Sequence, residues 1–244
     1  MEITINSDMG EGIGLHTFGF DAELMPHIQL ANIACGFHAS DPQVMAQTVK
    51  LAKLHEVKVG AHPGLPDLAG FGRRKMTLEA DEVENLVRYQ VGALSGFLKG
   101  EGLDLSHIKP HGALFGMVNS DESLMHAVVR VAQDYDVPIL GLHSGVGPQV
   151  CAATDVEFIP ELYVDLNYGR EGNLIIELVP QPTTPAAAYD RVKHALETGT
   201  VRSTDGSYIE MNFQSICIHS DNSGAVEITK AVRQAIDEIS STTQ

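Results

Sequence analysis

Histidines recur at one kind of place in this chain of 244 residues: each follows, by one to four residues, a short apolar run typical of a β-strand. The five are His38, His62, His111, His143 and His219. Imidazole exchanges protons near neutral pH and ligates metal ions. Their shared position therefore predicts a site for proton transfer or metal binding, although we expect His143, the weakest of the set, to be structural.

The runs that precede these histidines are Ile28–Cys35, Val57–Ala61, Ser106–Lys109, Pro138–Leu142 and Ser215–Ile218. A further run, Glu2–Asn6, leads in the same way to Asp8 and Glu11. In a parallel α/β barrel, the carboxyl ends of the strands meet at one face, where the loops that carry chemistry converge. Six segments thus predict one active site.

Helical patterns separate the runs, and the clearest cover 42–55, 78–100, 120–134, 185–198 and 224–240. Strands that alternate with helices about seven times predict βαβ units and a parallel sheet. This number favours a closed or nearly closed (β/α) barrel over an open doubly wound sheet. The glycines after the first run read G-x-G-x-G, which is too weak a pattern for a dinucleotide site.

The first motif, NSDMGEG, places the carboxylates of Asp8 and Glu11 beside glycines that allow a sharp turn. Such a pair can hold a metal ion, or divide into a base and an acid if their surroundings separate the two pKa values. The alternative is a capped loop in which Asp8 accepts only backbone hydrogen bonds.

Cationic residues form two further motifs. Arg73 and Arg74 end a Gly- and Pro-rich loop, and they suit a carboxylate or phosphate, with a surface salt bridge as the alternative. Lys109 stands two residues before His111, so both side chains face the same side of an extended segment. Inside a barrel Lys109 could polarise a carbonyl or stabilise an oxyanion; the alternative is a lysine that reaches the rim.

The last motif is IHSDNSG, in which His219 and Asp221 follow a strand and precede a helix start. Amide groups at a helix N-terminus can bind an anion. We expect His219, Asp221 and Asn32, together with the two arginines, to contact substrate or phosphate.

Composition limits the classes of function. The formal charge of −16 argues against nucleic-acid or anionic-membrane partners, and 43% hydrophobic residues without a linker-like segment predict one domain over residues 1–244. We find no signal peptide, membrane span, Walker A loop, G-x-S-x-G, C-x-x-C or H-E-x-x-H, and expect a cytosolic protein. Cys35, Cys151 and Cys217 are expected to be buried, reduced thiols.

The segments NSDMGEG, NIACGFHASDP, VGAHPGLPDLAGFGRR, IKPHGAL and ICIHSDNSGAV, in this order, resemble the LamB/YcsF family. The resemblance spans nearly the whole chain. It implies a seven-stranded (β/α) barrel of the glycoside hydrolase/deacetylase type, and the A-subunit role in ATP-dependent opening of the lactam 5-oxoproline to L-glutamate, with B and C partner subunits.

The resemblance also implies roles for the site residues. Lys109 with Arg73 and Arg74 would balance phosphate or oxyanion charge. Proton transfer would fall to Asp8, His38, His62 or His111, with Glu11 positioning a base, a metal ion or water. One departure concerns specificity: Leu166 and Gln181 stand where the family usually has arginines. The pocket is therefore expected to bind a free carboxylate less well.

Two alternatives remain open. The same fold could support a metal-dependent deacetylase or amidohydrolase, in which Asp8, His62 and His111 bind a divalent ion that activates water. A third interpretation is a non-catalytic regulatory subunit.

Overall fold

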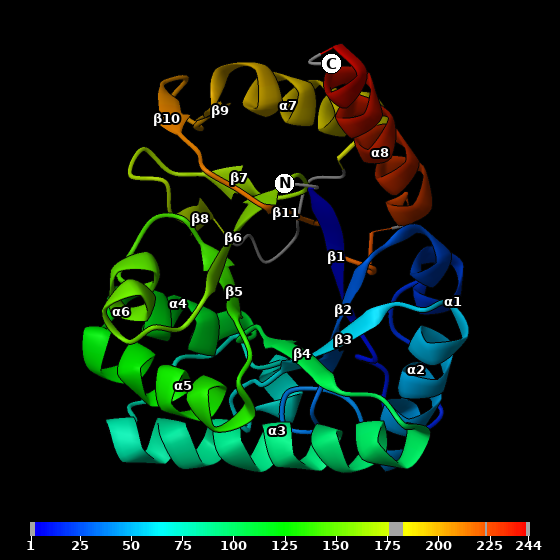
Figure 1. Ribbon diagram of the computed structural model, residues 1–244, viewed down its shortest axis with the longest axis vertical. Coiled ribbons are helices and arrows are strands. Elements are labelled where there is room, and N and C mark those ends of the chain that lie inside the picture. The colour runs from blue at the N-terminus through cyan, green and yellow to red at the C-terminus, as the bar shows by residue number, and fades with distance from the viewer. Residues whose placement is uncertain (1–2, 176–182, 223, 243–244) are drawn as a thin grey trace.

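A closed barrel of seven parallel strands forms the centre of the protein in the computed structural model, which describes residues 3–175, 183–222 and 224–242 (Figure 1). Around the barrel the strand order is β1-β11-β6-β5-β4-β3-β2. The strands are β1 (Thr4–Met9), β2 (Leu30–Ala34), β3 (Lys58–His62), β4 (Leu105–Ile108), β5 (Ile139–Leu142), β6 (Phe158–Tyr163) and β11 (Ser215–Cys217). The expected seven-stranded barrel is confirmed.

Helices surround the barrel, with α7 and α8 side by side at one end of the view in Figure 1 and α3 along the other. They are α1 (Asp21–Leu24), α2 (Pro42–Leu54), α3 (Ala80–Glu101), α4 (Gly112–Ser120), α5 (Glu122–Tyr135), α6 (Gly147–Ala153), α7 (Pro185–Thr198) and α8 (Ala225–Thr242), with 3-10 turns η1 (Met25–His27) and η2 (Leu68–Gly70). The five helices expected from the sequence are present, each within two residues of its expected bounds. No helix among the described residues is long and apolar enough to cross a membrane.

Helix starts follow the local chemistry of the sequence. The Asp41 carboxylate accepts the backbone N–H groups of Gln43 and Val44, and Pro42 occupies the first turn of α2. The pattern expected to begin at Ser120 is instead a boundary between two helices. Ser120 ends α4, while Asp121 caps α5 because its carboxylate reaches two free amides of the next turn.

Two small hairpins lie outside the barrel: β7 (Asn167–Tyr168) with β8 (Leu174–Ile175), and β9 (Thr200–Arg202) with β10 (Tyr208–Glu210). The first lies in the segment between β6 and α7. Gln181 lies outside the described residues.

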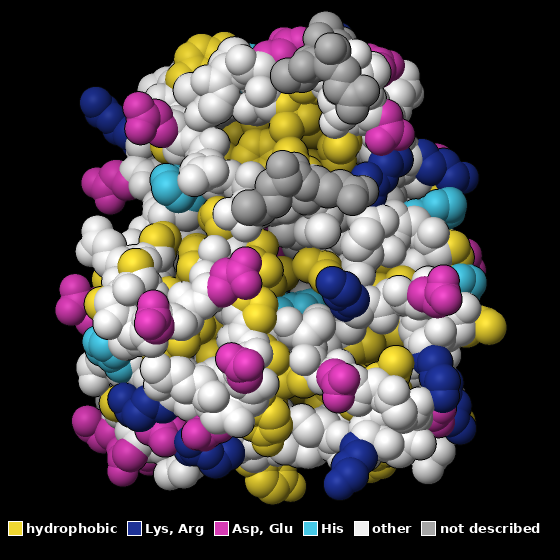
Figure 2. All heavy atoms as spheres, viewed as in Figure 1, with side chains coloured by type: hydrophobic (Ala, Val, Ile, Leu, Met, Phe, Trp, Pro, Cys, Tyr) yellow, Lys and Arg dark blue, Asp and Glu magenta, His cyan; other side chains and the backbone are white. Residues whose placement is uncertain are grey.

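Apolar strand side chains such as Ile5, Ile33 and Ile216 are fully buried, as are the polar residues Asn6 and Asn32 that alternate with them. Successive strand residues face opposite sides of a sheet, so the apolar set packs against helices while the polar set faces the barrel axis. All three cysteines are free and buried, as expected. On the face shown in Figure 2, acidic and basic side chains are interspersed.

Candidate active site

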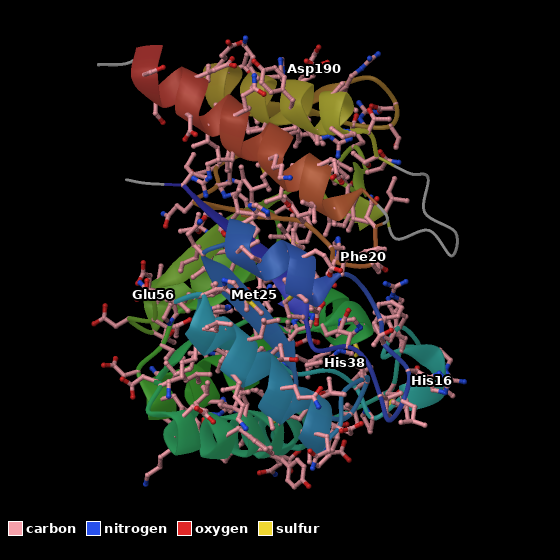
Figure 3. The ribbon with its side chains drawn as sticks, turned by 90° about the vertical axis from the view of Figure 1, so that its right-hand side faces the viewer. His16, Phe20, Met25, His38, Glu56 and Asp190 are labelled. Carbon is pink, nitrogen blue, oxygen red and sulfur yellow. The ribbon has the colours of Figure 1, made fainter. Side chains whose placement is uncertain are left out.

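Six side chains predicted to be catalytic form one buried cluster at the carboxyl end of the barrel, and none exposes more than 9% of its surface. They are Asp8, Glu11, His38, His62, Lys109 and His111. Asp8 belongs to β1 and His62 ends β3, whereas His111 stands at the N-cap of α4. In Figure 3, His38 lies inside the molecule, and His16 lies on the outer loop.

Asp8 is the hub of the cluster. Its Oδ1 accepts hydrogen bonds from Lys109 Nζ at 3.1 Å and Asn32 Nδ2 at 2.8 Å, and its Oδ2 lies 3.3 Å from His62 Nε2. Burial alone would raise the pKa of Asp8, but His62 and Lys109 bring it well below its ordinary value. Asp8 is therefore an ionised carboxylate at neutral pH.

Lys109 is enclosed at the barrel axis. Besides Asp8, its ammonium contacts Asn6 Oδ1 at 3.2 Å, Glu161 Oε1 at 3.2 Å and Cys217 Sγ at 3.1 Å. Burial would lower its pKa, but these neighbours, Asp8 foremost, raise it well above the ordinary value. An ammonium has three donors, so the contacts occupy Lys109 fully and leave none directed at an open space.

Glu11 lies in a different environment from Asp8. Its Oε1 lies 3.3 Å from His38 Nε2 and 3.4 Å from His111 Nδ1. Burial raises the pKa of Glu11. The pKa values of the two carboxylates of the first motif are therefore shifted in opposite directions. Asp8 is held ionised and Glu11 is biased toward its protonated form, as required of a base and an acid that share one site.

The imidazoles of His38 and His111 are stacked, with ring centroids 3.7 Å apart. Burial lowers the pKa of both rings well below the ordinary value, so both are neutral. Gly64 and Gly72 make room for them: a Cβ on Gly64 would lie 2.3 Å from His38 Nδ1, and one on Gly72 would lie 2.7 Å from His38 Cβ.

A layer of polar side chains below Asp8 fixes the orientation of its carboxylate; of this layer, the sequence predicted only Asn32 as a site residue. His107 Nε2 lies 2.6 Å from Asn32 Oδ1, and the Asn32 amide nitrogen donates to both Asp8 and Asn6. Asn6 donates in turn to Glu161 Oε1 at 2.8 Å. The available signal was a polar residue at alternate positions within otherwise apolar strands.

His219 stands at the edge of the cluster, with its side chain 24% exposed. Its Nδ1 lies 3.0 Å from Asp165 and its Nε2 lies 3.6 Å from Asp8 Oδ2. Burial would lower the pKa of His219, but Asp165 and Asp8 raise it to about 9. His219 is thus a partly exposed cation, and Asp165, which orients it, was not among the predicted site residues.

The remaining predicted residues either lie outside the buried cluster or are paired with other side chains of the protein. The Arg73 guanidinium lies over the Phe71 ring, 5.1 Å from its centroid, at the exposed rim. Arg74 pairs with Asp67, the surface alternative considered above, and Asp221 is exposed. Asn32 is buried and contacts Asp8 rather than solvent.

Two groups of side chains in the described part of the chain bring metal-ligating atoms within 4.8 Å of one another. One contains Glu11, His38, His62 and His111, and the other contains Asp8, Cys217 and His219. His62 and His111 therefore group with Glu11 and His38, whereas Asp8, predicted to join them, falls in the second group.

Across most of its length, the chain is similar in sequence to proteins named for lactam utilization or as the A subunit of 5-oxoprolinase. It is 44% identical over 238 residues to the lactam utilization protein lamB of Emericella nidulans, covering 96% of this chain and 94% of that protein. Its identity to the A subunit of 5-oxoprolinase from Thermococcus sibiricus is 42% over 242 residues, covering 98% and 95%.

A crystal structure of a lactam utilization protein from Thermus thermophilus superposes with a TM-score of 0.89 at 37% identity, covering 98% of both chains. The model of the LamB/YcsF family matches residues 3–244. With these matches, the chain belongs to the LamB/YcsF family.

Proposed function

We propose that this protein is the A subunit of a 5-oxoprolinase-type lactam hydrolase, which opens 5-oxoproline to L-glutamate or acts on a related cyclic amide. Family membership and the names of the relatives support the substrate class. The observation that carries the proposal is the pair of buried carboxylates, Asp8 and Glu11, whose pKa values are shifted in opposite directions beside three histidines.

A five-membered lactam is a stable amide, so its opening requires activation. We propose that ATP, with B and C partner subunits, phosphorylates the carbonyl oxygen. Water then adds to the carbonyl carbon, and the ring C–N bond breaks as the nitrogen takes up a proton, which leaves an acyl phosphate. A second water molecule releases phosphate. Such a cytoplasmic, ATP-dependent reaction needs a base, an acid and cations close together.

The geometry supports specific roles. Asp8, ionised and in contact with His62, would accept the proton of the attacking water through that imidazole. Glu11, biased toward its acid form, would protonate the departing nitrogen. Lys109 keeps Asp8 ionised, and His219 presents positive charge at the entrance, where Arg73 adds a second cation for carboxylate or phosphate.

The test is reconstitution with the B and C subunits and measurement of ATP-dependent glutamate release. Asp8→Asn keeps the shape but removes the charge, and turnover is expected to fall by about 10²–10⁴, the usual contribution of a positioned acid–base group. Glu56→Gln, on the exposed surface far from His38 in Figure 3, is the matched control and keeps full activity. Normal turnover in Asp8→Asn would refute the assignment.

Two other functions are distinguished by the same assay. A metal-dependent amidohydrolase is favoured by the donor group around His62 and His111, and it would lose activity with a chelator but not on removal of ATP. A non-catalytic subunit would give a complex whose turnover is unchanged by His111→Ala.

A further inference from the structure

Four buried ligating side chains point at one small volume between β1, β3 and the start of α4. His62 Nε2 lies 3.0 Å from His111 Nδ1, which lies 3.4 Å from Glu11 Oε1. That same oxygen lies 3.3 Å from His38 Nε2. All four residues are buried.

The opposite ring atoms fix the tautomers of two histidines. His62 Nδ1 lies 2.7 Å from the Lys109 carbonyl oxygen, and His111 Nε2 lies 2.8 Å from the Phe71 carbonyl oxygen. A carbonyl oxygen can only accept, so each of these nitrogens carries the hydrogen. When His62 Nε2 carries no hydrogen, its lone pair and that of His111 Nδ1 face each other across 3.0 Å, with Glu11 Oε1 3.4 Å from His111 Nδ1 and Asp8 Oδ2 3.3 Å from His62 Nε2.

Facing lone pairs and a carboxylate repel one another unless a positive centre lies between them. We propose that Glu11, His62 and His111 bind a divalent, zinc-like cation through Oε1, Nε2 and Nδ1. Two imidazoles and one carboxylate form a donor set that zinc accepts in proteins. The carbonyls of Phe71 and Lys109 supply the outer hydrogen bonds that orient ligating histidines.

The spacing of the donors agrees with a tetrahedral ion. Zinc bonds of 2.0–2.1 Å in tetrahedral geometry separate ligand atoms by about 3.3–3.4 Å, close to the 3.0 and 3.4 Å found around His111. The rings of His62 and His111 are inclined at 85°, so their lone pairs approach from different directions.

His38 has another role in this arrangement. Its ring is parallel to that of His111, with 5° between the planes, so the in-plane lone pairs of the two rings run side by side and do not meet at one ion. We assign His38 to a hydrogen bond from Nε2 to Glu11, which orients the carboxylate. The fourth position of the ion is then open to water or substrate, as in catalytic zinc sites.

With the ion bound, Glu11 and His62 are ligands, so the acid and relay roles proposed above for them belong to the ion-free site. The test measures binding and needs neither ATP nor partner subunits, so its outcome can be distinguished from that of the lactam proposal. Chelator-treated full-length chain is titrated with Zn²⁺ by calorimetry and, in parallel, with Co²⁺ by visible absorption. One ion per chain is expected, together with a rise in Tm of about 5–10 °C at a free Zn²⁺ concentration 100 times Kd.

His111→Ala and Glu11→Gln should each weaken Zn²⁺ binding by more than about 100-fold, since even outer hydrogen-bond partners contribute 10–100-fold. The exposed His55→Ala is the matched control and binds like the wild type. Circular dichroism confirms that the variants are folded, and the tetrahedral Co²⁺ spectrum disappears in His111→Ala whatever its stability.

Three results would overturn the proposal. The first is no Zn²⁺ binding by the wild type, which would mean that the two imidazoles share a proton. The others are equal Zn²⁺ binding by the wild type and the two ligand variants, or binding of Mg²⁺ alone, which would indicate an oxygen-ligated site elsewhere in the chain.

Discussion

The neighbourhood of Lys109 shows how a residue's role depends on what surrounds it. From the sequence, a lysine at a strand end predicts a charge donor for substrate, whose removal leaves the fold intact. In the structure its ammonium lies between the carboxylates of Asp8 and Glu161. Both carboxylates are buried, so Lys109 also compensates charge in the barrel interior.

Lys109→Met should therefore lower stability as well as turnover. Removing one partner from a buried ion pair costs about 3–5 kcal/mol, because the remaining charges lose compensation. Urea unfolding of the isolated chain measures this cost. Lys58→Met, at the exposed start of β3, is the matched control and should change stability little. A Lys109→Met protein as stable as the wild type would show that water enters and solvates the carboxylates.

His219 gives stability a predicted dependence on pH. Its folded-state pKa of about 9 lies above the unfolded value of 6.5, so its contribution is complete below pH 6.5 and is lost as pH rises through 9. The loss is on the order of 2–3 kcal/mol. Denaturant midpoints at pH 6.5 and 9.5 should differ more in wild type than in Asp165→Asn, which lacks the partner charge. Equal differences would assign the pH dependence to other groups.

Substrate choice is predicted from Leu166, whose partly buried side chain packs against the apolar core where the resemblance leads us to expect an arginine. A charge-assisted hydrogen bond contributes roughly 1.5–3 kcal/mol, or one to two decades of affinity. We expect 2-pyrrolidone, which lacks the carboxylate, to compete with 5-oxoproline better here than in relatives that keep the arginine. In the complete complex with ATP, a strong preference for 5-oxoproline would mean that Arg73, Arg74 or Arg170 replaces the missing charge.

At the scale of elements, the loop after β3 shapes the cluster as much as the strands do. It carries η2 and brings Phe71 and Gly72 against His111 and His38. Such contacts have no periodic signature in a sequence, because the loop folds back according to its glycines and prolines.

Gly64→Ala should displace His38 with little effect on the barrel. Its Cβ would overlap the imidazole, and a shift of about 1 Å at a site can cost 10²-fold in rate. Gly96→Ala is the matched control: it lies in α3 with open space around it and should raise stability by about 0.5–1 kcal/mol without affecting rate. The comparison uses turnover of the complete complex and thermal unfolding of each variant. Unchanged turnover in Gly64→Ala would show that the His38 position is not critical.

The alternation of strands and helices could be predicted because apolar periodicity and helix-capping residues are signals carried by neighbouring residues in the sequence. The contact between Asp8 and His62 could be anticipated because parallel strands end at one face. Glu161 and Asp165 were missed because no histidine follows β6, and because a carboxylate in an apolar strand reads as exposed until its partner on another strand is known. Pairings such as Lys109 with Glu161 arise only from closure of the barrel.

For the whole molecule, the net charge of −16 is compatible with small-molecule chemistry because the site contains cations of its own. Lys109 is buried beside Asp8 and His219 lies at the edge of the cluster, while the sequence as a whole carries twice as many acidic as basic residues. We propose that residues 1–244 form one domain, since every strand of the barrel contributes to a single closed sheet.

The polar layer below Asp8 also fills the barrel interior, so that no passage runs through the barrel beneath the site. His107 lies so close to β3 that a Cβ on Gly60 would be 2.1 Å from its ring, and Asn32 and Asn6 fill the space beside it. Reactants therefore arrive, and products depart, through the same mouth. Under the proposed function, L-glutamate formed at this site has to leave before the next lactam can enter, so it should act as a competitive inhibitor and its release can limit the rate of the cycle.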